Sequence, residues 1–99
     1  MNKQEHLWEV VQEEAIEIAK VVSKVQRFGL HNTQPASGKT NLQLLIEEIN
    51  DFYAGLEMLI EDEKVMSFSD ILPKKDLIAA KKKQVREHLE ISKEAGRLT

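Results

Sequence analysis

The fold of this chain is decided by residues 3 to 28, which read KQEHLWEVVQEEAIEIAKVVSKVQRF. Apolar residues recur there every three or four positions, as in an amphipathic α-helix; they include Leu7, Val11, Ile18, Val22 and Val25. The helix is expected to stop in residues 29 to 39, GLHNTQPASGK, because Gly, Asn, Pro and Ser disfavour helical backbone. This stretch therefore predicts one long helix whose apolar stripe needs a packing partner.

Two more helices are predicted after that loop. Thr40 is followed three residues later by Gln43, the form of a capping box, so a second helix begins near residue 40 and runs to about Glu61. A short irregular link containing Pro73 follows, and residues 74 to 95 form a third helix. No segment alternates with the period of a strand. We expect an all-α protein, with an antiparallel helical bundle of two long helices and a third C-terminal helix.

Length and composition bound the class of protein. Residues 1 to 99, of which 41% are hydrophobic and 31% charged, fit a single domain, and a core this small is often completed by self-association, so we expect a homodimer or homotetramer. The net charge of −3 disfavours nucleic acid as a partner, and no apolar run reaches the roughly 18 residues of a membrane span. The absence of cysteine suits a reducing compartment, so a cytoplasmic location is expected.

Charge is distributed unevenly along the chain. Residues 1 to 73 carry 6 basic and 13 acidic side chains, whereas residues 74 to 99 carry 8 basic and 4 acidic ones. One interpretation is that the helices pair by charge on their solvated faces. The other is that the basic third helix binds phosphate.

Both long helices place a carboxylate inside the apolar stripe. On a wheel of about 100° per residue, Glu14 in the first helix and Glu48 in the second fall among the apolar residues that define the stripe. Glu17 and Asp51 follow one turn later, at the border of each stripe. Two antiparallel helices that pack stripe against stripe would bring these four carboxylates together.

Four carboxylates in one place require a compensating cation. Burying an ionised carboxylate without a partner costs several kcal/mol, and four would also repel one another. Oxygen ligands without sulfur or a nearby histidine favour Mg²⁺ or Mn²⁺. The alternative is that each Glu-x-x-Glu or Glu-x-x-Asp pair forms salt bridges with Lys or Arg of a neighbouring helix.

The two acidic motifs resemble those of a known family. Residues 13 to 17 read EEAIE and residues 47 to 51 read EEIND, which is similar to the EExxE and EExxD signature of the MazG-type all-α nucleoside triphosphate pyrophosphohydrolases. The resemblance covers roughly residues 7 to 60 and is greatest to compact, single-domain members of the kind carried by phages. It implies Mg²⁺-dependent conversion of an NTP or dNTP to the monophosphate and pyrophosphate by a dimer or tetramer, with Glu14, Glu17, Glu48 and Asp51 as metal ligands.

Four further residues are candidates for the reaction. Glu13 lies at the edge of the acidic group and is either a base for the attacking water, as the resemblance also suggests, or a solvated surface residue. Lys24 and Arg27 are candidate phosphate contacts, and exposed basic residues near a helix end also occur without a function. Lys81 lies on the apolar face of the third helix, where it either extends along that face to solvent or contacts phosphate.

Two functions follow from these observations. The first is a metal-dependent nucleotide pyrophosphohydrolase. The second is a non-catalytic helical interaction module in which the acids pair with the basic third helix. They differ in their demand for a metal ion.

Overall fold

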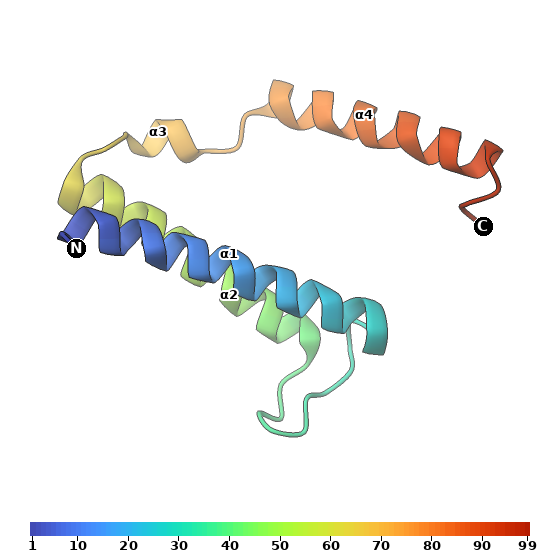
Figure 1. Ribbon diagram of the computed structural model, residues 1–99, viewed down its shortest axis with the longest axis horizontal. Coiled ribbons are helices and arrows are strands. Elements are labelled where there is room, and N and C mark those ends of the chain that lie inside the picture. Colours follow the sequence, from blue (N-terminus) through green and yellow to red (C-terminus); the bar gives the residue numbers. More distant parts are fainter.

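The chain is built from helices joined by irregular connections, the longest of which runs from residue 29 to residue 40 (Figure 1). The computed structural model describes residues 1–99, in the order α1 (Lys3–Phe28), α2 (Asn41–Glu63), α3 (Phe68–Ile71) and α4 (Lys75–Glu94). There is no β-strand, and Thr33 and Thr40 form only an isolated bridge. None of these helices is both long enough and apolar enough to cross a membrane. The prediction of an all-α protein is confirmed.

Local hydrogen bonds set the ends of the two long helices. At the start of α1, the Asn2 side-chain oxygen accepts a hydrogen bond from the Glu5 N–H at 2.8 Å. The helix ends at Gly29, whose φ of +94° is accessible to glycine and strained for other residues. At the start of α2, the Gln43 N–H donates to Thr40 Oγ1 at 3.1 Å and the Thr40 N–H donates to Gln43 Oε1 at 2.8 Å. The predicted capping box is therefore confirmed.

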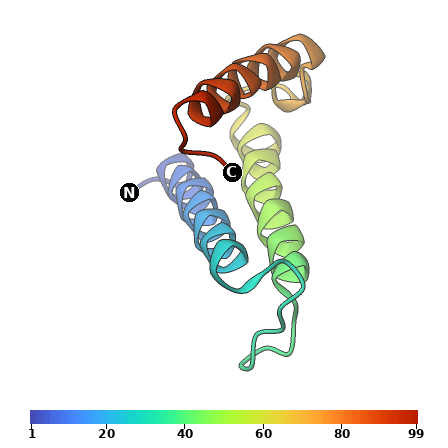
Figure 2. The same cartoon turned by 90° about the vertical axis from the view of Figure 1, so that its right-hand side faces the viewer.

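Helices α1 and α2 form an antiparallel hairpin, which Figures 1 and 2 show side by side. At one end Lys3 near the start of α1 pairs with Asp62 near the end of α2, with 3.3 Å between Nζ and Oδ2. Gly55 is buried at a close approach, because a Cβ at this position would lie 3.0 Å from Cγ2 of Val11. The buried apolar core consists of Leu7, Val21, Leu59 and Ile60. The hairpin thus fixes which faces of the two helices meet.

Asn41 locks the other end of the hairpin. This side chain is fully buried, and its Nδ2 donates to the carbonyl of Gly29 at 2.8 Å. Its Oδ1 accepts from Gln34 Nε2 at 2.7 Å, and its own N–H donates to the carbonyl of Asn32 at 3.0 Å. One buried amide therefore ties the end of α1, the loop and the start of α2 together.

The connection after α2 contains one helical turn where an irregular link was expected. This turn, α3, contacts α2 and begins with the Ser67 N–H donating to Asp70 Oδ2 at 2.8 Å. That hydrogen bond stabilises the ionised carboxylate and lowers the pKa of Asp70. Lys74 Nζ donates to the carbonyl of Ser69 just before α4 begins. The link is therefore held by its own hydrogen bonds.

Helix α4 stands apart from the hairpin (Figures 1 and 2). It makes no packing contact with α1 or α2 within the chain. Its apolar residues Ile78, Val85 and Leu89 are 42%, 43% and 45% exposed. Within one chain, the predicted antiparallel arrangement is therefore confined to α1 and α2, because the link directs α4 away from them.

Candidate metal centre

Three carboxylates from the two helices of the hairpin converge. Glu14 of α1 and Glu48 and Asp51 of α2 each offer one oxygen, and these oxygens lie within 4.8 Å of one another. Glu14 and Glu48 are half-buried, whereas Asp51 is exposed. These three residues, hereafter the carboxylate cluster, are three of the four predicted metal ligands.

Two oxygens of the cluster are buried without a hydrogen-bond donor. Oε2 of Glu14 and Oε2 of Glu48 are both removed from solvent, and no group of the chain donates to either. An ionised carboxylate normally keeps several hydrogen bonds, so a buried oxygen without one is costly to the folded state. The hairpin therefore places two acceptors where only a proton or a cation can satisfy them.

The surroundings of Glu48 favour its protonated form. Burial is the main cause that raises the pKa of Glu48 to about 7, followed by the carboxyl group of Glu14, with which a protonated Glu48 can share its proton. The charges of Asp51 and Glu17 raise it further. In the absence of a cation the cluster therefore holds a proton at pH values where an ordinary glutamate is ionised.

The fourth predicted ligand, Glu17, does not join the group of three. Its Oε1 accepts from Lys20 Nζ at 3.1 Å, on the same helix. Glu17 remains close enough for its charge to act on Glu48. The helical wheel puts Glu17 at the border of the stripe, and in the structure its side chain is 44% exposed and pairs with the lysine one turn later.

No basic side chain neutralises the cluster. The ion pairs of the chain are Lys3–Asp62, Lys20–Glu17 and Lys39–Glu47, and none of them includes Glu14, Glu48 or Asp51. The basic helix α4 is not packed against the hairpin. The salt bridges that the alternative interpretation requires are therefore not formed within one chain.

The remaining predicted site residues lie on α1 and α4 and are not part of the cluster. Glu13 is exposed on α1, next to Glu14. Lys24 is half-buried further along α1, and Arg27 is exposed with its guanidinium 5.1 Å from the centre of the Phe28 ring. Lys81 lies on α4, exposed, and its Nζ donates to Gln84 Oε1 at 3.4 Å. The structure thus keeps Lys24 and Arg27 on the helix that carries Glu14, and places Lys81 on a separate helix.

Sequence reasoning missed two residues that shape this region. Lys39, in the loop, donates from its Nζ to Glu47 Oε1 at 2.7 Å. It therefore forms an ion pair with the first glutamate of the second motif. Asn41 fixes the start of α2 against the end of α1. No motif indicated either residue. Lys39 and Glu47 are eight residues apart on either side of the start of α2, a spacing that helical periodicity does not predict. Asn41 is an asparagine near a helix start, which is common.

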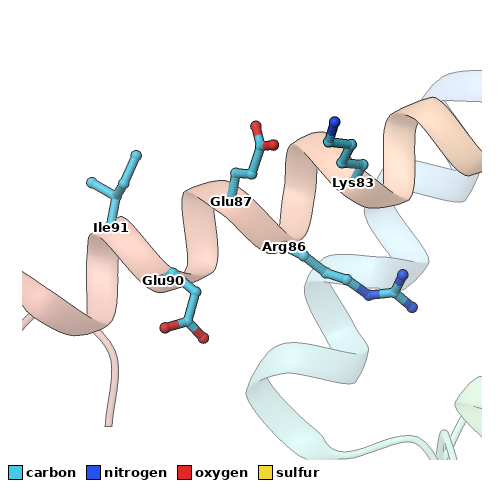
Figure 3. A pocket seen from close by; sticks show the side chains of 5 residues that line it. All are labelled: Lys83, Arg86, Glu87, Glu90 and Ile91. Atoms are coloured by element: carbon cyan, nitrogen blue, oxygen red, sulfur yellow. The ribbon is translucent and has the colours of Figure 1, made fainter.

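Helix α4 carries shallow surface hollows of its own. One is lined by Lys83, Arg86, Glu87, Glu90 and Ile91. Figure 3 shows that Lys83 and Glu87 point to one side of the helix and Arg86 and Glu90 to the other. These side chains do not converge on a common point, so this hollow is not a candidate catalytic site.

The cluster fits a hard divalent cation. Its donors are all carboxylate oxygens, they come from two helices held by a packed core, and two of the oxygens have no other partner. Comparison with protein-family models, curated proteins and solved structures finds no match to this chain. The resemblance to the MazG-type family therefore remains a prediction that depends on the two acidic motifs.

Proposed function

We propose that this protein is a metal-dependent nucleoside triphosphate pyrophosphohydrolase of the MazG type, active as a homodimer or homotetramer. The observation that carries the proposal is the pair of buried, donorless oxygens on Glu14 and Glu48, within a group of three convergent carboxylates. Buried carboxylate oxygens without a donor destabilise the metal-free protein. Such a cost is expected at a site where the function requires negatively charged ligands.

The cluster residues would hold Mg²⁺ or Mn²⁺. Glu14, Glu48 and Asp51 would supply the convergent oxygens, and Glu17 would be a fourth ligand if its carboxylate leaves Lys20. When bound, the metal would supply positive charge that attracts the triphosphate and stabilises the leaving pyrophosphate. Glu17 would therefore exchange its lysine partner for the metal when the metal binds.

The remaining groups act on water and phosphate. Water attacks the α-phosphorus of the triphosphate, the bond between the α-phosphorus and the bridging oxygen breaks, and the products are a nucleoside monophosphate and pyrophosphate. Glu13, exposed beside Glu14, accepts the proton of the attacking water on its carboxylate. Lys24 and Arg27 on α1, and Lys81 on α4, are the candidate contacts for the phosphates.

The test is pyrophosphate release from the eight common NTPs and dNTPs in the presence of Mg²⁺. Parent protein should hydrolyse at least one of them, and Glu48→Gln should lose most of that activity. The matched control is Glu57→Gln, which changes an exposed glutamate on the opposite side of the same helix. Release from no nucleotide by the parent protein would contradict the proposal.

A second candidate function is a non-catalytic helical interaction module. The exposed apolar residues of α4 favour it, because an unpacked amphipathic helix is suited to binding another helix. Under this function Mg²⁺ leaves the melting temperature unchanged, whereas under the first function Mg²⁺ raises it. A Mg²⁺ titration of thermal stability separates the two.

A further inference from the structure

Helix α4 has one face that combines apolar and basic residues. On a wheel of about 100° per residue, Ile78, Val85 and Leu89 fall within about 40° of one another. The basic residues Lys81, Lys82 and Arg86 lie on either side of this apolar row, within about 80° of its centre. A shallow hollow on the helix is lined by Lys81, Lys82, Val85, Arg86 and Leu89. This face, hereafter the α4 seam, is an apolar row with basic borders.

The acidic residues of α4 all avoid the seam. They lie at least about 120° from its centre on the same wheel, and they are Asp76, Glu87, Glu90 and Glu94. Such segregation is not needed for a helix that is solvated all round, where mixed charges suffice. The seam therefore has the pattern of a helix that docks on an apolar surface with acidic borders.

The hairpin offers a surface with that pattern. Glu13 and Glu17 on α1 are displaced from Glu14 in the same rotational sense as Glu47 and Asp51 are from Glu48, by about 60° to 100°. Because α1 and α2 are antiparallel and face one another, equal rotations bring these acids to the same side of the hairpin, hereafter its acidic side.

Apolar groups lie along this side as well. The wheel places Phe28 and Met58 there, and the two are 55% and 42% exposed. Phe28 is at the loop end of the hairpin, whereas Met58 lies toward the other end. A helix of 20 residues, about 30 Å long, is of the right length to lie between them.

We propose that α4 of one copy docks along the acidic side of the hairpin of a second copy, and that the two copies exchange α4 reciprocally as a homodimer. The seam buries its apolar row against the second hairpin, and its basic borders lie beside the acidic side. There Glu13 and Asp51 have no ion-pair partner in their own chain, whereas Glu17 and Glu47 are each paired with a lysine. Lys81 and Arg86 of one copy thereby come next to the carboxylate cluster of the other, so each site draws basic groups from both copies.

The second copy is favoured over the chain's own hairpin by the link before α4. That link is fixed by the packing of α3 on α2, by the Ser67–Asp70 hydrogen bond and by the Lys74–Ser69 hydrogen bond, and it leaves α4 clear of α1 and α2. With these contacts in place, the apolar row of α4 meets no surface of its own chain. Docking on another copy keeps them and buries the same surface.

The first experiment measures mass in solution by light scattering. The parent chain should be a dimer at micromolar concentration, and either Val85→Asp or Leu89→Asp should give the 11.4 kDa monomer with unchanged helical circular dichroism. Glu90→Gln, on the opposite face of α4, is the matched control and should remain dimeric. A dimer that survives both aspartate substitutions would overturn the proposal, since it would place the interface elsewhere. These readouts are independent of catalysis, so their failure and the failure of the proposed function are distinguishable.

The second experiment identifies which hairpin α4 contacts. The chain contains no cysteine, so single thiols can be introduced at Lys82→Cys on α4 and Ala54→Cys on α2, and cross-linked with a short bismaleimide. A mixture of the two single variants should give a cross-linked species of twice the chain mass. If only the double variant cross-links, and only within one chain, α4 docks on its own hairpin and the exchange is wrong. If neither cross-links, the seam serves a different partner and the proposal fails.

Discussion

Glu14 and Glu48 each bury one carboxylate oxygen at the contact between α1 and α2, and neither oxygen receives a hydrogen bond from the chain. Asp51 adds a third oxygen within 4.8 Å. The residues around them form an otherwise ordinary apolar helix contact. A buried carboxylate oxygen without a donor is costly to the folded state, and under the proposed function a bound cation offsets that cost.

Replacing either buried glutamate by glutamine should separate stability from activity. Glu14→Gln or Glu48→Gln removes a buried charge and supplies an amide donor to its neighbour, so the metal-free melting temperature should rise by roughly 5 °C for about 1 kcal/mol gained. The same variants lose a charged ligand, so kcat for pyrophosphate release should fall by about a hundredfold or more. Calorimetry and a pyrophosphate assay check the two effects, with Glu57→Gln as control. Full activity in either variant would remove the catalytic assignment.

Divalent cations should stabilise the folded protein. Mg²⁺ or Mn²⁺ at a hundred times its dissociation constant adds about 2.7 kcal/mol, because it binds the folded state alone. Thermal denaturation with increasing Mg²⁺ should therefore shift upward, and Asp51→Asn should abolish the shift. The control, Asp62→Asn, removes a carboxylate that pairs with Lys3 at the end of the hairpin, and should keep the shift. A parent melting curve that does not respond to either ion would disprove the metal centre.

Without metal, the free energy of unfolding should fall as the pH rises toward and through about 7. A salt-bridged acid, whose pKa is lowered in the folded state, has the opposite effect. The pKa of Glu48 is raised from 4.5 in the unfolded chain to about 7 in the folded one. The folded state therefore binds the Glu48 proton more tightly than the unfolded chain does. The stabilisation of the folded state by this proton is complete below about pH 4.5 and is lost as the pH rises through about 7. Urea denaturation between pH 4.5 and 8 in the presence of a chelator measures this loss, and Glu48→Gln should flatten the profile over that range. An equally steep profile in the variant would show that another group is responsible.

Asn41 should be the most costly polar residue of the hairpin to remove. Asn41→Ala deletes the hydrogen bonds to Gly29 and from Gln34 and opens a cavity, so the free energy of unfolding should fall by about 2 to 4 kcal/mol. Asn50→Ala is the control, because its exposed amide makes one hydrogen bond to Ile46 and should cost less than about 0.5 kcal/mol. Chemical denaturation of both variants checks the difference. Equal costs would contradict the role of Asn41 in closing the loop.

Gly55 and Val11 should be energetically coupled. A methyl group added at position 55 would lie 3.0 Å from Val11 Cγ2. Gly55→Ala should therefore gain about 1 kcal/mol of stability from helix propensity and lose a similar amount to crowding against Val11. In a Val11→Ala background the crowding is absent and the gain should appear. A double-mutant cycle should therefore give a coupling energy of about 1 kcal/mol, and additive effects would show that the helices are not in close contact there.

Much of the secondary structure could be predicted from the sequence, because helix periodicity and helix capping depend on residues only a few positions apart. The periodic apolar residues gave α1 the predicted extent of residues 3 to 28, and the hydrogen bonds of Thr40 and Gln43 start α2 as expected. The second helix continues two residues beyond the expected Glu61, and the third spans Lys75–Glu94 instead of residues 74 to 95. Helix ends depend on single hydrogen bonds, so shifts of this size are ordinary.

The sequence by itself determined that Glu14 and Glu48 would face the apolar contact and that Asp51 would lie at its border, because their positions on the two helices follow from a fixed rotation per residue. Tertiary structure alone decided that Glu17 pairs with Lys20, that Asn41 is buried across the loop, and that α4 stays clear of the hairpin. The first two outcomes depend on which hydrogen-bonding partner lies nearest in space, and the third depends on the direction of the link between α2 and α4. Periodicity fixes the face on which a side chain lies, whereas packing determines which partner it meets.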